Sequence, residues 1–184
     1  MMRLLISLLL ACIVATYLQA ESYVYVEDGI KLPLKNEGVV VYAGTPVKII
    51  SKDGDNYKVQ IEGYLGKEKK GLYATKNLKL LLAKVDNPKL FKKEKGKKVS
   101  LVFTIPKKYI TDDIDDAWEY GSDLFYDKCT RCHHAKVIEK HTMREWNVLY
   151  NSMKFKAKTT KDEDKKILRF LRAFAKDGIL KESD

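Results

Sequence analysis

The chain has 184 residues, of which 45% are hydrophobic and 33% are charged, and its formal net charge at pH 7 is +10. Lysine supplies most of this charge and is spread along the chain, so the excess favours a partner with an acidic surface or is simply a solvated surface. The sequence has no arginine-rich stripe and no aromatic stacking motif, which argues against a nucleic-acid partner.

The first 20 residues have the pattern of a secretory signal. Arg3 supplies the positive start, residues 4–18 form an apolar run, and Ala20 is the small residue at its end. The run is shorter than a membrane span usually requires, so an uncleaved anchor is the lesser alternative. A lipid anchor on Cys12 is a second lesser alternative. We therefore expect residues 1–20 to be cleaved and the remainder to be exported to the periplasm.

Residues 21–110 have the pattern of a β domain, because β-branched and aromatic residues alternate or cluster between turn signals. We expect strands over residues 23–26, 39–42, 46–50, 57–61 and 99–105, with a hairpin turn over residues 53–56. The stretch 44–63 resembles a bacterial SH3-type domain, which implies a small β-barrel. This half contains no His and no Cys, so we expect it to dock or space the second half, or to be purely structural.

From residue 111 onward the hydrophobic spacing becomes helical. Apolar residues and one glycine recur at positions 114, 117, 118, 121, 124 and 125, and four aspartates near the start suit the positive end of a helix dipole. A second helix is expected over residues 142–153, with Trp146, Leu149, Tyr150 and Met153 on one face. A third begins at the capping box formed by Thr160 and Glu163, and Gly178 is expected to end it.

The segment Cys129-Thr130-Arg131-Cys132-His133, directly after the first of these helices, has the Cys-x-x-Cys-His pattern of covalent c-type haem attachment. In this chemistry the two thiols form thioethers with the two haem vinyl groups. The two intervening residues let the chain turn so that His133 lies under the iron as its proximal ligand. The motif therefore predicts one covalently bound haem c.

Three other interpretations of the same residues fit less well. A thioredoxin-like motif should lie at the end of a strand in a βαβ pattern, whereas here a helix precedes it. A structural zinc site needs more ligands than the motif supplies, and after Cys132 the chain offers only His133, His134 and His141, with no second Cys pair to close the site. A structural disulfide framework is not available, because Cys129 and Cys132 are the only cysteines left after the signal is removed.

The sixth iron ligand has several candidates in the sequence, namely Met153, Met143, His134 and His141. We favour Met153, because a thioether opposite histidine is a common choice for electron transfer and raises the potential. The alternative for a Met on an apolar helix face is a core residue. His141 is the alternative sixth ligand and would lower the potential, whereas His134 adjoins His133 and can hardly reach the opposite haem face.

The spacing Gly121-x-x-x-Phe125-x-x-x-Cys129 resembles the amino-terminal helix of the cytochrome c fold. In that family the glycine lets this helix cross the carboxy-terminal helix closely, and the aromatic residue packs at the crossing. The resemblance implies a two-domain β + α chain. Its SH3-like β-barrel would cover residues 21–110, and an all-α, class I-like cytochrome c domain would cover residues 111–184.

A closer resemblance covers residues 117–177. The segments Ala-Trp-Glu and Leu-Phe-Tyr before the haem motif, Trp146 followed by Met153, and Leu-Arg-Phe-Leu-Arg-Ala-Phe-Ala-Lys-Asp near the end are similar to one family. It is the carboxy-terminal monohaem domain of the pentahaem cytochrome that feeds trimethylamine N-oxide reductase. The resemblance implies electron transfer to a periplasmic molybdenum enzyme. Because only one haem motif is present, it also implies a separate upstream donor, quinol-linked or itself a cytochrome.

The leading functional hypothesis is therefore a periplasmic electron carrier to a molybdenum-containing trimethylamine N-oxide or dimethyl sulfoxide reductase. Such a carrier is not itself an enzyme, because an iron with two axial ligands has no open position for a substrate. One alternative keeps the carrier and changes the terminal enzyme to an oxidase, a peroxidase or a nitrate reductase. Another is a haem sensor with five-coordinate iron, for which the β half would be a recognition module.

Overall fold

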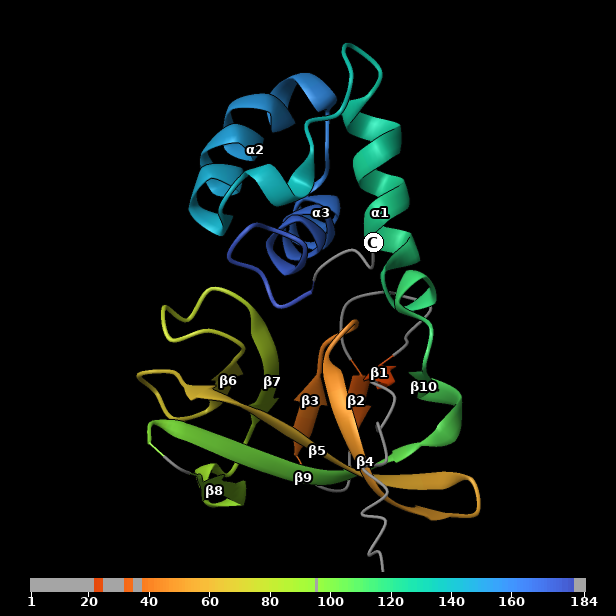
Figure 1. Cartoon of the computed structure of the whole chain (residues 1–184), viewed down its shortest axis with the longest axis vertical. Helices are drawn as coiled ribbons and strands as arrows, with labels where there is room; N and C mark the ends of the chain where they lie inside the picture. Colours follow the sequence, from red (N-terminus) through yellow and green to blue (C-terminus); the bar gives the residue numbers. More distant parts are fainter. Residues whose placement is uncertain (1–21, 25–31, 35–37, 95, 181–184) are drawn as a thin grey trace, which may run out of the picture.

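The computed structural model describes residues 22–24, 32–34, 38–94 and 96–180, so the expected signal segment lies outside the described residues. Figure 1 shows strands on one side of the molecule and three α-helices on the other. The strands are β1 Ser22–Val24, β2 Leu32–Leu34, β3 Val39–Val41, β4 Pro46–Asp53, β5 Asn56–Leu65, β6 Gly71–Tyr73, β7 Leu81–Val85, β8 Phe91–Lys93, β9 Lys98–Pro106 and β10 Ile110–Thr111. Three short 3-10 helices cover Pro88–Leu90, Lys107–Tyr109 and Ile138–Lys140.

The sheet is built around the long strand β5, which pairs antiparallel with β4, β6 and β9. Tyr57, Val59 and Ile61 alternate toward the buried face, opposite Ile105, Phe103 and Leu101 of β9. This period of two is what the sequence pattern indicated for both segments. The turn between β4 and β5 lies at residues 53–56, as predicted, with Gly54 at a φ of +53°.

The predicted segments 39–42, 46–50, 57–61 and 99–105 overlap β3, β4, β5 and β9, although β3 ends one residue earlier and the other three strands are longer than predicted. The first predicted strand is only partly testable, because residues 25 and 26 lie outside the described residues. Several short strands were not predicted, and most of them have only two or three residues. Such segments are too short to establish a period of two, and their partners in the sheet determine their conformation.

The three helices are α1 Ile114–Cys129, α2 Met143–Ala157 and α3 Lys161–Ala173. The predicted capping box at Thr160 and Glu163 is present, and Thr142 and Glu145 form a second one that starts α2. The predicted stop at Gly178 is wrong by five residues. After Ala173 the chain turns back, and the N–H groups of residues 179 and 180 both donate to the Ala173 carbonyl. None of these described helices is long and apolar enough to cross a membrane.

The predicted fold class is wrong. The structure is a mostly-β half-barrel with three helices at its carboxy-terminal side, and not a small barrel followed by an all-α, class I cytochrome c domain. The physical reason is that the helices do not complete their own core. Tyr23 from β1 and Leu80 from the loop before β7 belong to the same buried cluster as the helices.

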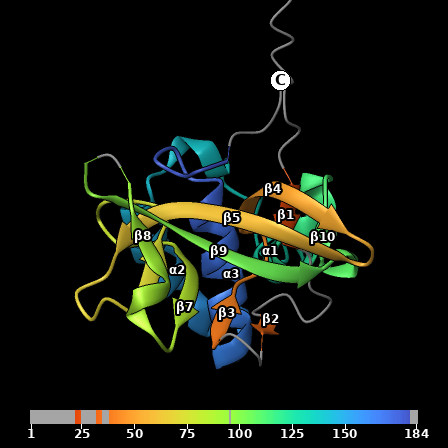
Figure 2. The ribbon, with the colours of Figure 1, turned by 90° about the horizontal axis from the view of Figure 1, so that it is seen from below.

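Two further contacts join α1 and α3 to the sheet. Trp118 of α1 packs directly over Gly44, where a Cβ atom would lie 2.2 Å from the indole ring. Arg169 of α3 donates hydrogen bonds to the backbone carbonyls of Ala43 and Leu81. Seen from below, α3 lies behind β5 and β9, so the sheet covers the side of α3 that an all-α domain would leave to solvent or to another helix (Figure 2).

Candidate haem site

The end of α1 delivers the first cysteine of the motif. Cys129 is the last residue of the helix, and Thr130 ends it by donating from its backbone N–H and its hydroxyl to the Tyr126 carbonyl, at 3.2 and 2.6 Å. Arg131 then folds back, because its guanidinium binds both carboxylate oxygens of Asp127 at 2.8 and 2.9 Å. These bonds turn the chain locally between Cys129 and Cys132.

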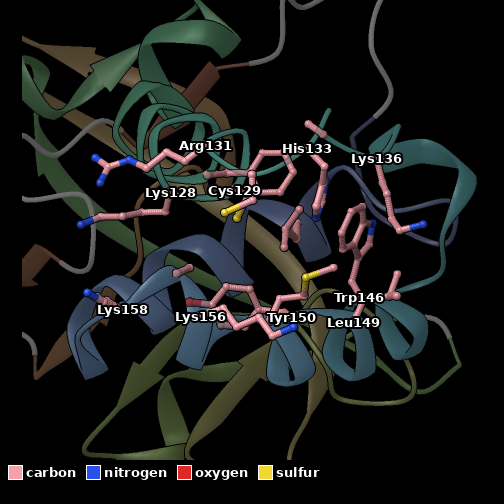
Figure 3. Close-up of a pocket in the computed structure, with 16 residues that line it drawn as sticks. Lys128, Cys129, Arg131, His133, Lys136, Trp146, Leu149, Tyr150, Lys156 and Lys158 are labelled. Atoms are coloured by element: carbon pink, nitrogen blue, oxygen red, sulfur yellow. The ribbon is translucent and has the colours of Figure 1, made fainter.

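A cavity of about 490 Å³ lies between α1, α2 and α3, next to this turn. Cys129, Cys132, His133 and Met153, the four residues predicted to hold a haem, all line it. Figure 3 shows Cys129 and His133 on one side of the cavity. Its apolar walls are Phe125, Ala135, Trp146, Leu149, Ala157 and Leu171. The volume lies in the range of cofactor pockets, which is about 300–1,000 Å³.

The ring of His133 is oriented by the backbone. Its Nδ1 lies 2.8 Å from the carbonyl oxygen of His134, which can only accept a hydrogen bond. Nδ1 of His133 therefore carries the proton, and a neutral ring leaves the lone pair of Nε2 available. This is the usual arrangement of a metal-binding histidine, in which the second ring nitrogen donates to a carbonyl or carboxylate.

The candidate sixth ligands lie in different places. Met153 is half-buried on α2 and lines the cavity. His141 is half-buried outside the cavity lining, with its ring edge-on to Trp146 at 5.2 Å between centroids. Met143 is fully buried in the core, and His134 is exposed. Of these four side chains, the structure brings only Met153 to the cavity that Cys129 lines.

Five cations, Lys128, Arg131, Lys136, Lys156 and Lys158, also line the cavity, whereas none of the described lining residues is a carboxylate. Lys128 pairs with Glu163 at 3.1 Å, and Arg131 pairs with Asp127. Sequence reasoning found the lysine excess but not this convergence. Two stretches far apart in the chain contribute, residues 128–136 and 156–158, so no local signal could have revealed it. The haem propionates are carboxylates, and a cationic rim suits them.

Tyr150 is one of the α2 residues that line the cavity, and it also belongs to a polar network. Its hydroxyl donates to Asp164 Oδ1 at 2.7 Å and lies 3.2 Å from Thr159 Oγ1, which joins α2 to the start of α3. Burial, together with the nearby Asp164 carboxylate, raises the pKa of Tyr150, so the phenol stays protonated. Partial burial likewise raises the pKa of the Cys129 thiol.

The donor set fits a c-type haem. Two thiols, one imidazole with a free Nε2 and one thioether line a single apolar cavity with a cationic rim. A raised thiol pKa at Cys129 is the opposite of what a dithiol redox catalyst needs, because its attacking cysteine has a lowered pKa. Within the described ranges no three His, Cys, Asp or Glu side chains cluster as a metal site. A haem iron requires only two axial protein ligands, because the porphyrin supplies the other four.

Comparison with known proteins found one informative relative. The chain is 31% identical over 81 residues to "Cytochrome c-type protein TorY" of Haemophilus influenzae, and this stretch is 44% of the chain and 22% of the relative. The chain therefore spans only a minor part of that protein. No family model matches the chain, and no solved structure matches it. The similarity supports a cytochrome of the c type, without the specific link to a pentahaem carboxy-terminal domain.

Proposed function

We propose that the protein is a monohaem c-type cytochrome that carries single electrons between partner proteins in the periplasm and is not itself an enzyme. The observation that carries this proposal is that Met153, predicted separately as the sixth ligand, lines the same apolar cavity as Cys129, Cys132 and His133 of the haem motif. The relative that is named a c-type protein supports the same chemistry. A bound haem would supply an iron that cycles reversibly between the ferric and ferrous states.

Each residue has a distinct role in this proposal. The thiols of Cys129 and Cys132 would hold the haem through thioethers to its two vinyl groups, at the end of α1. His133 would bind the iron through Nε2, because its Nδ1–H is held by the His134 carbonyl. Met153 of α2 would be the second protein ligand of the iron. The apolar walls would lower the polarity around the haem, which favours the ferrous state.

The terminal partner is proposed to be a periplasmic molybdenum-containing reductase of trimethylamine N-oxide or dimethyl sulfoxide. The support is the resemblance of residues 117–177 to the monohaem domain that serves such an enzyme. The cationic rim of the cavity supports an acidic partner surface, because opposite charges accelerate association of electron-transfer proteins. The upstream donor is a separate quinol-linked protein or a cytochrome.

The proposal is tested by re-oxidation of the reduced holoprotein in a periplasmic extract, followed at the visible haem band. Trimethylamine N-oxide, dimethyl sulfoxide, nitrate and peroxide are added separately, with an extract-free sample as control. We expect oxidation with the first two acceptors. Oxidation only by nitrate or peroxide would keep the carrier and change its terminal enzyme, and oxidation by none would contradict the assignment to N-oxide and S-oxide respiration.

Carbon monoxide distinguishes the carrier from a five-coordinate haem sensor. A ferrous iron with both axial positions filled binds carbon monoxide slowly or weakly, because a protein ligand must first leave. We expect slow binding that accelerates when Met153 is replaced. Fast binding to the unmodified protein would favour the sensor.

A further inference from the structure

The end of α2 that carries Met153 lacks apolar anchors. The buried side chains of α2 are those of Met143, Trp146 and Tyr150. All three precede Met153, and none of residues 151–157 is buried. Segments with few buried apolar contacts open most easily. Apolar packing therefore fixes the first part of α2, whereas the turn that carries Met153 needs other contacts to hold it at the wall of the cavity.

One carboxylate supplies such contacts. Asp164, in the first turn of α3, accepts hydrogen bonds at Oδ1 from the hydroxyls of Tyr150 and Thr159, at 2.7 and 2.6 Å. Its Oδ2 lies 3.4 Å from the Lys154 ammonium. The Thr159 hydroxyl also lies 3.3 Å from the Lys154 carbonyl oxygen, in the last turn of α2. Because these partners precede and follow Met153 in the chain, Asp164 ties α2 to α3 on both sides of that residue.

The Asp164 carboxyl is ionised at neutral pH, which strengthens these bonds. Burial by itself would raise its pKa, but the hydrogen bonds from Thr159, Tyr150 and Lys154 outweigh burial and lower the pKa. Hydrogen bonds to an ionised acceptor are roughly twice as strong as those between neutral groups. The ion pair with Lys154 is partly exposed and contributes little, so the two hydroxyls provide most of the attachment.

A simpler explanation is that Asp164 only stabilises the dipole of α3. The same first turn also contains Asp162 and Glu163, which have this effect as well. The Asp162 carboxylate pairs with Lys166 of the same helix, and the Glu163 carboxylate caps Thr160. Neither carboxylate is bonded to α2 in the part of the chain that the structure describes. The dipole explains an acidic residue at position 164, but it does not explain why this side chain bonds to a residue of the cavity wall.

We propose that Asp164 is a positioning residue for Met153, an inference that rests on the proposed function. By holding the hydroxyls of Tyr150 and Thr159, it keeps the end of α2 against α3 and the Met153 thioether at the cavity wall. Figure 3 shows Tyr150 on the other side of the cavity from His133. Without the carboxylate, the end of α2 would open more easily, and an external ligand would replace the thioether more readily.

The experiment measures the affinity of the ferric holoprotein for imidazole, which competes with Met153 for the iron, from the change in the haem spectrum. We expect Asp164→Ala to bind imidazole roughly 5- to 100-fold more tightly than the unmodified protein, as loss of hydrogen bonds to a charged group predicts. Asp162→Ala is the matched control, because it removes the same charge from the same turn of α3, and its affinity should not change. Asp164→Asn keeps an acceptor oxygen and should lie between the two.

A double-mutant comparison separates positioning from a general structural role. In the Met153→Ala background the ligand position is already open, so adding Asp164→Ala should leave the imidazole affinity unchanged. The proposal is overturned if Asp162→Ala has the same effect as Asp164→Ala, or if the effect of Asp164→Ala persists without Met153.

Two further outcomes are distinguishable. If Asp164→Ala does not fold, Asp164→Asn takes its place, and an imidazole affinity equal to that of the unmodified protein would overturn the proposal. If the unmodified protein binds imidazole as tightly as Met153→Ala does, Met153 is not an iron ligand. That result would contradict the proposed function before any Asp164 variant is compared, and the inference would fall with it.

Discussion

Gly121 of α1 lies directly against Phe170 of α3, where a Cβ built on the glycine would be 2.9 Å from the Cβ of Phe170. The same Cβ would lie 3.5 Å from the Lys166 carbonyl oxygen, so the two helices cross without room for any side chain. One turn later, Phe125 packs against Phe170 and Trp146 with ring centroids 6.0 and 5.9 Å apart. This crossing brings α1, and with it the Cys-x-x-Cys-His segment, next to α3.

The first prediction follows from this crossing. Gly121→Ala should destabilise the protein, although alanine in a helix is normally about 1 kcal/mol more favourable than glycine. The added Cβ collides with an atom close to the α3 backbone, and overpacking of this kind costs about 1–3 kcal/mol. Urea unfolding should therefore give a net loss of stability. Ser122→Ala, at the next position of α1, is the control, and a gain in stability for Gly121→Ala would contradict the close crossing.

A second prediction concerns the sixth iron ligand. Met153→Ala should open the iron and lower the redox potential, because a thioether ligand raises it. Absorbance of the ferric protein and potentiometric titration measure the two effects. His141→Ala is the matched control and should change neither, since His141 packs against Trp146 outside the cavity lining. If the His141 variant changed the ligand spectrum and the Met153 variant did not, histidine would be the ligand.

The third prediction concerns the contact between α3 and the sheet. Arg169→Lys keeps the charge but loses the planar fork that bonds the carbonyls of Ala43 and Leu81. Because a part-buried carbonyl is then left unpaired, we expect a loss of about 1–3 kcal/mol of unfolding free energy. Arg144→Lys, on the exposed side of α2, should be neutral. Equal stability of the two variants would show that the Arg169 guanidinium does not hold α3 against the sheet.

Acid should weaken the start of α3. The backbone N–H of Thr160 donates a hydrogen bond to the Glu163 carboxylate at 2.7 Å, and Lys128 forms an ion pair with the same carboxylate. These two contacts lower the pKa of Glu163. A carboxyl with a lowered folded-state pKa stabilises the protein above its unfolded pKa of about 4.3, and this contribution is lost as the pH falls through the folded value.

Thermal unfolding between neutral pH and about pH 3 measures this dependence. Glu163→Gln should lose stability at neutral pH and show a shallower decline in acid, because the ionisable group has been removed. Glu68→Gln, at an exposed position of the sheet side, is the control and should follow the unmodified protein. An unchanged acid profile for Glu163→Gln would mean that this contact makes no measurable contribution.

Several elements follow directly from local sequence. The helix that begins at Thr160 is specified by its own capping box, and the turn at Gly54 by its own residue types. The Cys-x-x-Cys-His motif is equally local, since its residues are adjacent in the chain. Haem attachment and the roles of Cys129, Cys132, His133 and Met153 remain predictions.

The sequence by itself therefore determined the main strands, the helices and the identity of the candidate haem residues. The hydrophobic periodicity, the helix capping boxes and the Cys-x-x-Cys-His motif all depend on residues that are near one another in the chain. Tertiary structure alone decided that the helices share a core with the sheet, since contacts such as Trp118 on Gly44 join residues far apart in sequence. It also decided the cationic rim of the cavity. A charged patch depends on which helix faces converge, and no local pattern records that convergence.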